Sequence, residues 1–231
     1  EQYPDAFIIW NILGAAHKRL GKTFEASEAF EKVIEINPNY ADGHSNLGVT
    51  LQEQGKLDES IMSFKKALSL KPDYTEAHFN MGVTLKEQGK LEKAIEAYRK
   101  ALALNPDYAE AYNNMGATLQ GQGKLEEAIE AYKKALKLKS DYAEAYNNMG
   151  NAHKDQDKLE QAIEAYKKAL KLKPDYAEAY NNMGNALKDQ DKLEQAIKAY
   201  SRALSIKPDY AEAYNNMGNA HKDQDKLEQA I

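Results

Sequence analysis

Cysteine is absent from the 231 residues, so the chain can form no disulfide and no cysteine-ligated zinc or iron–sulfur site. Long apolar runs are missing too, since none approaches the roughly 20 residues that cross a bilayer. The net charge is −5, so bulk attraction to nucleic acid or an anionic membrane is not expected. We therefore expect a cytoplasmic protein with neither membranes nor nucleic acid among its partners.

The few prolines are spaced regularly. Consecutive prolines lie 34 residues apart, except for one gap of 68 in which Ser140 occupies the expected position. Seven glycines, from Gly14 to Gly218, follow the same step of 34. A fixed period of this length is the signature of stacked repeats, and it argues against one or two globular domains.

Each unit has the pattern of two helices. In residues 109–142, Tyr112, Met115 and Leu119 lie three or four residues apart and define one helical face. Gly123 can then take a positive φ that ends the first helix, and a second apolar face follows. The proline of each unit ends the second helix, because the residue before a proline is disfavoured in the α region.

Small residues recur at fixed places in the unit. Gly116 and Ala128 are expected to let the two helices of one hairpin approach closely. In the last three units Asp157, Asp191 and Asp225 replace the turn glycine. An aspartate at this place has to adopt the left-handed conformation, which costs about 1–2 kcal/mol for an ordinary L-residue.

A lone hairpin of this kind cannot bury its apolar face, so neighbouring hairpins have to stack. We predict an all-α fold, an α-solenoid of 34-residue helix-turn-helix repeats. Its first helices would line a concave groove and its second helices the convex side. Residues 1–6 match the end of a preceding repeat. The repeats are expected at 7–40, 41–74, 75–108, 109–142, 143–176, 177–210 and, incomplete, 211–231.

A recurring set of residues resembles the signature of the tetratricopeptide repeat family. In the first unit this set is Trp10, Leu13, Gly14, Ala26, Phe30 and Pro38. The resemblance covers essentially the whole chain and implies a right-handed superhelix that binds other polypeptides. Departures are local: Tyr or His replaces Trp after the first unit, and Ser60 stands where other units have Ala.

Histidine and tyrosine follow the period rather than forming separate clusters. His44 and His78 take the place of Trp10, while three other histidines alternate with leucine at a second place, which favours packing over metal binding. The periodic tyrosines, including Tyr112, Tyr146, Tyr180 and Tyr214, are interpreted as core, with a base-stacking platform as the alternative. No nucleophile–base pair or phosphate loop is found, so we expect no catalysis and no cofactor.

Lysines cluster on the second helices, for example Lys133, Lys134 and Lys137. We interpret this stripe as a solvated helix face, with a weak contact for acidic partners as the alternative.

Asparagine recurs on the first helices and is the strongest candidate for function. A carboxamide carries both donor and acceptor, so it can pair with a peptide group whatever its side chain. Similar ladders line the repeat domain of O-linked N-acetylglucosamine transferases, which implies that an extended peptide is held by its backbone. The alternative is that each asparagine pairs with a neighbouring helix. The candidate residues are Asn46, Asn80, Asn114, Asn148, Asn182 and Asn216 in a first row, Asn113, Asn147, Asn181 and Asn215 beside it, and Asn151, Asn185 and Asn219 three residues on.

The sequence therefore predicts a protein- or peptide-binding scaffold that uses the concave groove. Two alternatives stay open. The chain could be the substrate-recruiting arm of a larger enzyme, such as a glycosyltransferase, whose catalytic domain lies outside residues 1–231. It could also be a self-assembling array, because near-identical units with open ends allow end-to-end association.

Overall fold

The computed structural model describes residues 6–229, with side chains up to Asp225, and every regular element in this range is an α-helix. Of the expected tail at 1–6, only Ala6 lies within the described residues. The helices are α1 (Ala6–Arg19), α2 (Thr23–Ile36), α3 (Ala41–Glu53), α4 (Leu57–Leu70), α5 (Thr75–Glu87), α6 (Leu91–Leu104), α7 (Ala109–Gly121), α8 (Leu125–Leu138), α9 (Ala143–Asp155), α10 (Leu159–Leu172), α11 (Ala177–Asp189), α12 (Leu193–Ile206) and α13 (Ala211–Gln229).

The turn between the two helices of a hairpin is a left-handed cap. Gly55 ends α3 with a φ of 75°, and the amide of Lys56 donates to the carbonyl of Leu51 at 2.9 Å. This bond pattern satisfies carbonyls that the helix end would otherwise leave unpaired. Asp157 and Asp191 adopt the same conformation with a φ of 58°, which confirms the predicted left-handed aspartates at these two turns.

The second helices end at the same place in every complete hairpin, with or without proline. The amide of Lys71 closes α4 on the carbonyl of Ala67 at 2.8 Å, and Pro72 follows. In α8 the amide of Lys139 closes on Ala135 at the same distance, although Ser140 follows. Proline is therefore not what ends this helix; the turn and the packing of the next repeat suffice.

An aromatic ring of the second helix lies on a glycine of the first. Phe30, Phe64, Tyr98, Tyr132, Tyr166 and Tyr200 are at most 1% exposed. A Cβ built on Gly48 would lie 2.8 Å from the ring of Phe64, and one on Gly184 would lie 2.5 Å from that of Tyr200. The predicted close approach of the two helices is present, and the ring fills the place where a side chain would stand.

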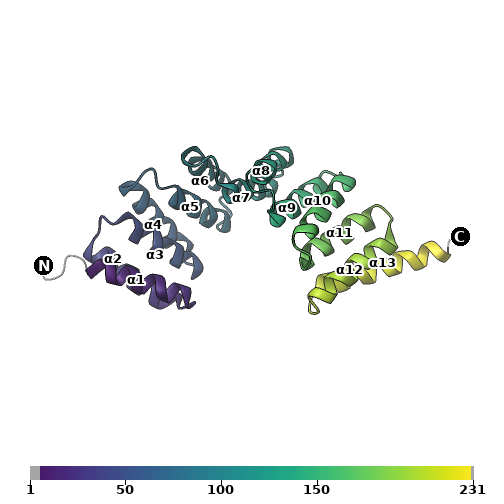
Figure 1. Ribbon diagram of the computed structural model, residues 1–231, viewed down its shortest axis with the longest axis horizontal. Helices are drawn as coiled ribbons and strands as arrows, with labels where there is room; N and C mark the ends of the chain where they lie inside the picture. The colour runs from purple at the N-terminus through teal and green to yellow at the C-terminus, as the bar shows by residue number, and fades with distance from the viewer. Residues whose placement is uncertain (1–5, 230–231) are drawn as a thin grey trace. The chain divides into compact units, whose positions relative to one another are not determined.

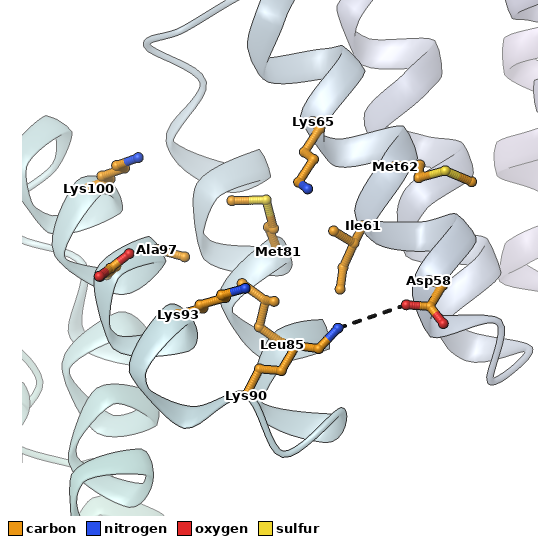
Figure 2. A pocket seen from close by; sticks show the side chains of 11 residues that line it. Asp58, Ile61, Met62, Lys65, Met81, Leu85, Lys90, Lys93, Ala97 and Lys100 are labelled. Carbon is orange, nitrogen blue, oxygen red and sulfur yellow. Dashed lines mark ion pairs between the residues drawn. The ribbon is translucent and has the colours of Figure 1, made fainter.

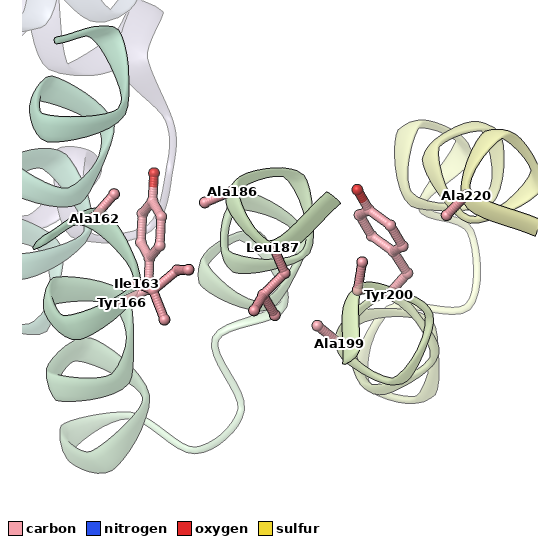
Figure 3. Close-up of a cluster of buried hydrophobic side chains, with 9 residues drawn as sticks. Ala162, Ile163, Tyr166, Ala186, Leu187, Ala199, Tyr200 and Ala220 are labelled. Carbon is pink, nitrogen blue, oxygen red and sulfur yellow. The ribbon is translucent and has the colours of Figure 1, made fainter. Parts of the chain in front are cut away.

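The helices divide into two compact units, Glu1–Thr118 and Leu119–Ile231, and each is considered by itself (Figure 1). Within a unit, a second helix packs on its own first helix and on the first helix of the next repeat, as α4 does on α3 and α5. The core is therefore continuous from repeat to repeat. In the second unit it includes Ala162, Ile163 and Tyr166, then Leu187, and then Ala199 and Tyr200 (Figure 3).

Two expectations near the C-terminal end are wrong. Asp225 does not turn the chain, because α13 continues through it to Gln229. Tyr214, expected in the core, is 52% exposed. Its counterparts Tyr146 and Tyr180 are only partly buried, against Leu170.

Replacing Gly184 by Ala should destabilise the fold, because the new Cβ would lie 2.5 Å from Cε1 of Tyr200. We expect the free energy of unfolding to fall by about 1–3 kcal/mol, as for other overpacked cores, in urea titrations followed by circular dichroism. Gly218→Ala is the matched control, because among the described residues no atom would lie within 4 Å of its Cβ. A Gly184→Ala variant as stable as the wild type would contradict the packing described.

Replacing Asp191 by Gly should stabilise the protein, because glycine adopts the φ of 58° without strain. After the larger entropy of an unfolded glycine is subtracted, a net gain of about 0.5–1 kcal/mol is expected. The reciprocal variant, Gly89→Asp, should lose a similar amount at the equivalent turn. The measurement is the melting temperature of each variant and of the wild type. A lower melting temperature for Asp191→Gly would contradict the prediction, because it would show that the aspartate side chain stabilises the turn by more than its backbone strain costs.

Candidate functional site

The first row of asparagines lies partly buried on the first helices and reaches back to the preceding repeat. Asn182 donates from Nδ2 to Oδ1 of Asn147 at 3.1 Å, and Asn216 donates to Asn181 at 3.0 Å. Asn46 makes the same bond to Asn11 at 3.1 Å. In these places the row forms hydrogen bonds between repeats, as the alternative interpretation predicted.

Phe79 interrupts this arrangement because it stands where other repeats have the accepting asparagine. Asn114, which would donate to position 79, instead donates to the carbonyl of Glu110 in its own helix at 3.0 Å. For Asn80, the place of the accepting asparagine in the preceding repeat is occupied by Ser45. The side chain of Asn80 makes no hydrogen bond within the described residues. Asn148 is partly buried at the same place on α9.

Three of the four asparagines in the second row lie inside the stack, and the fourth, Asn215, is exposed. Asn147 and Asn181 are fully buried and Asn113 is 7% exposed. The amide of Asn181 donates to Oε1 of Glu212 at 3.0 Å, and that of Asn147 donates to Oε1 of Glu178 at 3.4 Å. Each of these two buried asparagines therefore accepts a hydrogen bond from an asparagine and donates one to a glutamate. Both partners lie on the first helix of the next repeat.

The third row accepts hydrogen bonds from the buried tyrosines. The hydroxyl of Tyr166 donates to Oδ1 of Asn151 at 2.7 Å, and that of Tyr200 to Asn185 at 2.8 Å. Burial raises the pKa of both tyrosines, so the hydroxyls remain protonated donors at neutral pH. Their counterpart Asn219 is exposed.

The first row keeps hydrogen-bonding capacity after these bonds are made. A carboxamide has two N–H groups and a carbonyl oxygen with two lone pairs. Asn182 and Asn216 each use one N–H, and within the described residues the Oδ1 atoms of both accept no hydrogen bond. Both side chains are partly exposed, so a ligand on the first-helix face can reach the remaining groups.

Sequence comparison places the chain in a family. A family model described as the cilia and flagella-associated protein 70 C-terminal domain matches residues 6–207. The chain belongs to this tetratricopeptide family. No curated protein sequence matches the tetratricopeptide chain.

Solved structures with the same fold include MamA, which is 30% identical over 71% of this tetratricopeptide chain and 96% of its own, with a TM-score of 0.65. A chain of the APC/C hetero-tetramer Cut9–Hcn1 is 19% identical with a TM-score of 0.79, and the match covers 93% of this chain but 42% of the other. YrrB, described as a TPR protein with an unusual peptide-binding site, is 23% identical over 82% of this chain and 98% of its own, with a TM-score of 0.64.

Two of the five histidines in the tetratricopeptide repeats are buried, whereas His221 is exposed. His44 and His78 are 8% exposed, and Nε2 of each donates to a proline carbonyl, at 2.9 Å to Pro38 and 3.0 Å to Pro72. Within the described residues no three potential ligands gather where a metal ion could be held, and no helix is long and apolar enough to span a bilayer.

Glutamines form a second set of bonds between tetratricopeptide repeats, and sequence reasoning missed them. Gln88, at the end of a first helix, donates to Oδ1 of Asp58 at the start of the preceding second helix, at 2.9 Å. Gln190 donates to Glu160 in the same way at 2.7 Å. The signal was available, because a glutamine and an acidic residue recur at these two places with the 34-residue period.

Replacing Asn181 by Ala should destabilise this tetratricopeptide domain, because it removes a buried amide with bonds to Glu212 and Asn216. We expect a loss of about 1–3 kcal/mol in the free energy of unfolding. Asn215→Ala is the control, since Asn215 holds the same place in the next repeat and is exposed. Equal stability of the two variants in urea titrations would show that the buried amide chain contributes nothing.

Proposed function

We propose that this tetratricopeptide domain is a non-catalytic scaffold that binds an extended polypeptide along the face formed by its first helices. The observation that carries the proposal is the remaining hydrogen-bonding capacity of Asn182 and Asn216, repeated at a step of 34 residues. Amides that both donate and accept suit a peptide backbone, whose N–H and C=O groups recur along an extended chain. The peptide-binding site ascribed to YrrB supports the class of ligand.

The proposed site consists mainly of the first row. In the second row, Asn147 and Asn181 are too deeply buried to meet a ligand directly, so they position Asn182 and Asn216 instead. In the third row, Asn151 and Asn185 are partly exposed and already accept from tyrosine hydroxyls, which leaves their amide N–H groups to donate. Because recognition would use the ligand's backbone, its side-chain sequence should matter little.

The test is a triple variant in which Asn148, Asn182 and Asn216 become Ala. Peptides are first selected from a displayed random library with the wild-type protein, and their affinities for both proteins are measured by fluorescence anisotropy. Each lost backbone hydrogen bond contributes about 0.5–1.5 kcal/mol, so the triple variant should bind roughly one to three decades more weakly. The selected peptides should share no strong side-chain consensus.

The control separates binding from stability. Asn147→Ala with Asn181→Ala removes buried amides, so it should lower the melting temperature at least as much as the triple variant. At a temperature where all proteins are folded, the control should retain more of the wild-type affinity than the triple variant. Wild-type affinity in the folded triple variant would remove the ladder from the binding mechanism.

A further inference from the structure

A trough lies on the opposite side of the first unit, between the second helices α4 and α6 and above α5 (Figure 2). It consists of two adjoining cavities of about 450 Å³ and 680 Å³, which share Lys65, Met81 and Lys100 in their linings. Volumes of this size are typical of ligand-binding pockets. The trough exists because second helices pack on the first helix between them rather than on one another.

The floor of the trough is apolar. Ile61 of α4 and Leu85 of α5 face one another across it, and the thioether of Met81 projects between them and Lys100 (Figure 2). Leu68 and Leu104 extend the apolar lining into the second cavity, where Leu104 is 42% exposed. A bound side chain would therefore gain about 25 cal/mol for each Å² of apolar surface that it buries here.

The rim carries an excess of positive charge although the whole chain is negative. The first cavity is lined by four lysines, Lys65, Lys90, Lys93 and Lys100, against two acidic residues, Asp58 and Glu96. Lys90 pairs with Asp58 at 3.9 Å, as the dashed line in Figure 2 shows. Within the described residues, the other three lysines make no ion pair.

The equivalent cleft of the second unit keeps apolar residues at the places of Ile61, Met81 and Leu85 and also carries four basic residues, but its cavity is smaller, so the size of the trough is not simply a consequence of the period. Between α10 and α12 the cavity is about 220 Å³. Glu164 stands there where Met62 stands in the first unit, and it pairs with Lys168 at 2.9 Å. At the places of Ser69 and His78, which line the larger cavity, the second unit carries Lys171 and Tyr180.

We propose that this trough is a second binding site, which takes a short acidic segment of another protein that carries large apolar side chains. The apolar side chains would lie on Ile61, Met81 and Leu85, while the carboxylates meet the lysine rim. The proposal is independent of the asparagine rows, because it uses the other face of the repeats.

The test uses the full chain and fluorescein-labelled peptides in which Glu alternates with Leu and Phe. Matched peptides replace Glu with Gln or replace Leu and Phe with Ser. Anisotropy titrations should show that each replacement weakens binding by about tenfold or more, because charge and apolar burial each contribute. Binding of the acidic peptide should also weaken as salt is raised.

Two variants locate the site. Lys65→Ala with Lys100→Ala removes the two lysines that line both cavities. Ser69→Lys with His78→Tyr fills the second cavity with the residues that the second unit carries at the same places, so the fold should be retained. Each should raise the Kd of the acidic peptide by about tenfold. The control, Lys167→Ala with Arg202→Ala, alters the equivalent places of the second unit and should change it by less than about twofold.

Three outcomes would overturn the proposal. Wild-type affinity in the variant that lacks Lys65 and Lys100 would show that the peptide does not use the trough, because these two lysines line both cavities. An equal loss in the Lys167 and Arg202 control would show that lysines act through diffuse charge. Binding of a labelled oligouridylate as tightly as the peptide would assign the lysines to phosphate. The ladder variant should bind the acidic peptide normally, so failure of one proposal is distinguishable from failure of the other.

Discussion

The contact between an aromatic ring and a backbone glycine sets the geometry on which the other features depend. In the hairpin of α11 and α12 the ring of Tyr200 leaves no room for a Cβ at position 184, so the ring lies directly on the first helix. The hydroxyl of Tyr200 then reaches the third asparagine row and donates to Asn185, whereas that of Tyr132, in a hairpin without an asparagine at this place, donates to Gln120. Phe64 needs no acceptor, and Val49 stands at the corresponding place in its hairpin.

Between repeats, polar bonds supplement a thin apolar core made largely of alanine. Along the second unit, Asn216 donates to the buried Asn181, which donates to Glu212, and the same chain of bonds recurs one repeat earlier. A buried amide left without partners is costly, so these bonds favour one register of stacking over a slipped one. In the second unit, buried amides therefore favour one register of stacking, while apolar packing holds the repeats together.

The period predicted the helices, their turns and the aromatic core, because these depend on residues within one repeat. It did not identify the partners of the asparagines, because bonds such as Asn182 to Asn147 span 35 residues and depend on how one hairpin lies on the next. The continuation of α13 through Asp225 could not be predicted from local sequence, because residues 211–231 are identical to 143–163, where Asp157 does form the turn. The trough was missed because it depends on departures from the repeat, such as His78 in place of tyrosine.

The two faces of the repeats differ in what a ligand has to disturb. A peptide on the first helices meets amides that already link neighbouring repeats, so a bond to Asn182 has to use its second N–H or its carbonyl oxygen, or else compete with Asn147. A segment in the trough would meet three lysines that make no ion pair within the described residues, and an apolar lining in which Leu104 is 42% exposed. The proposed binding on the first-helix face would therefore be coupled to the stacking of repeats, whereas the proposed binding in the trough would depend on charge and apolar burial.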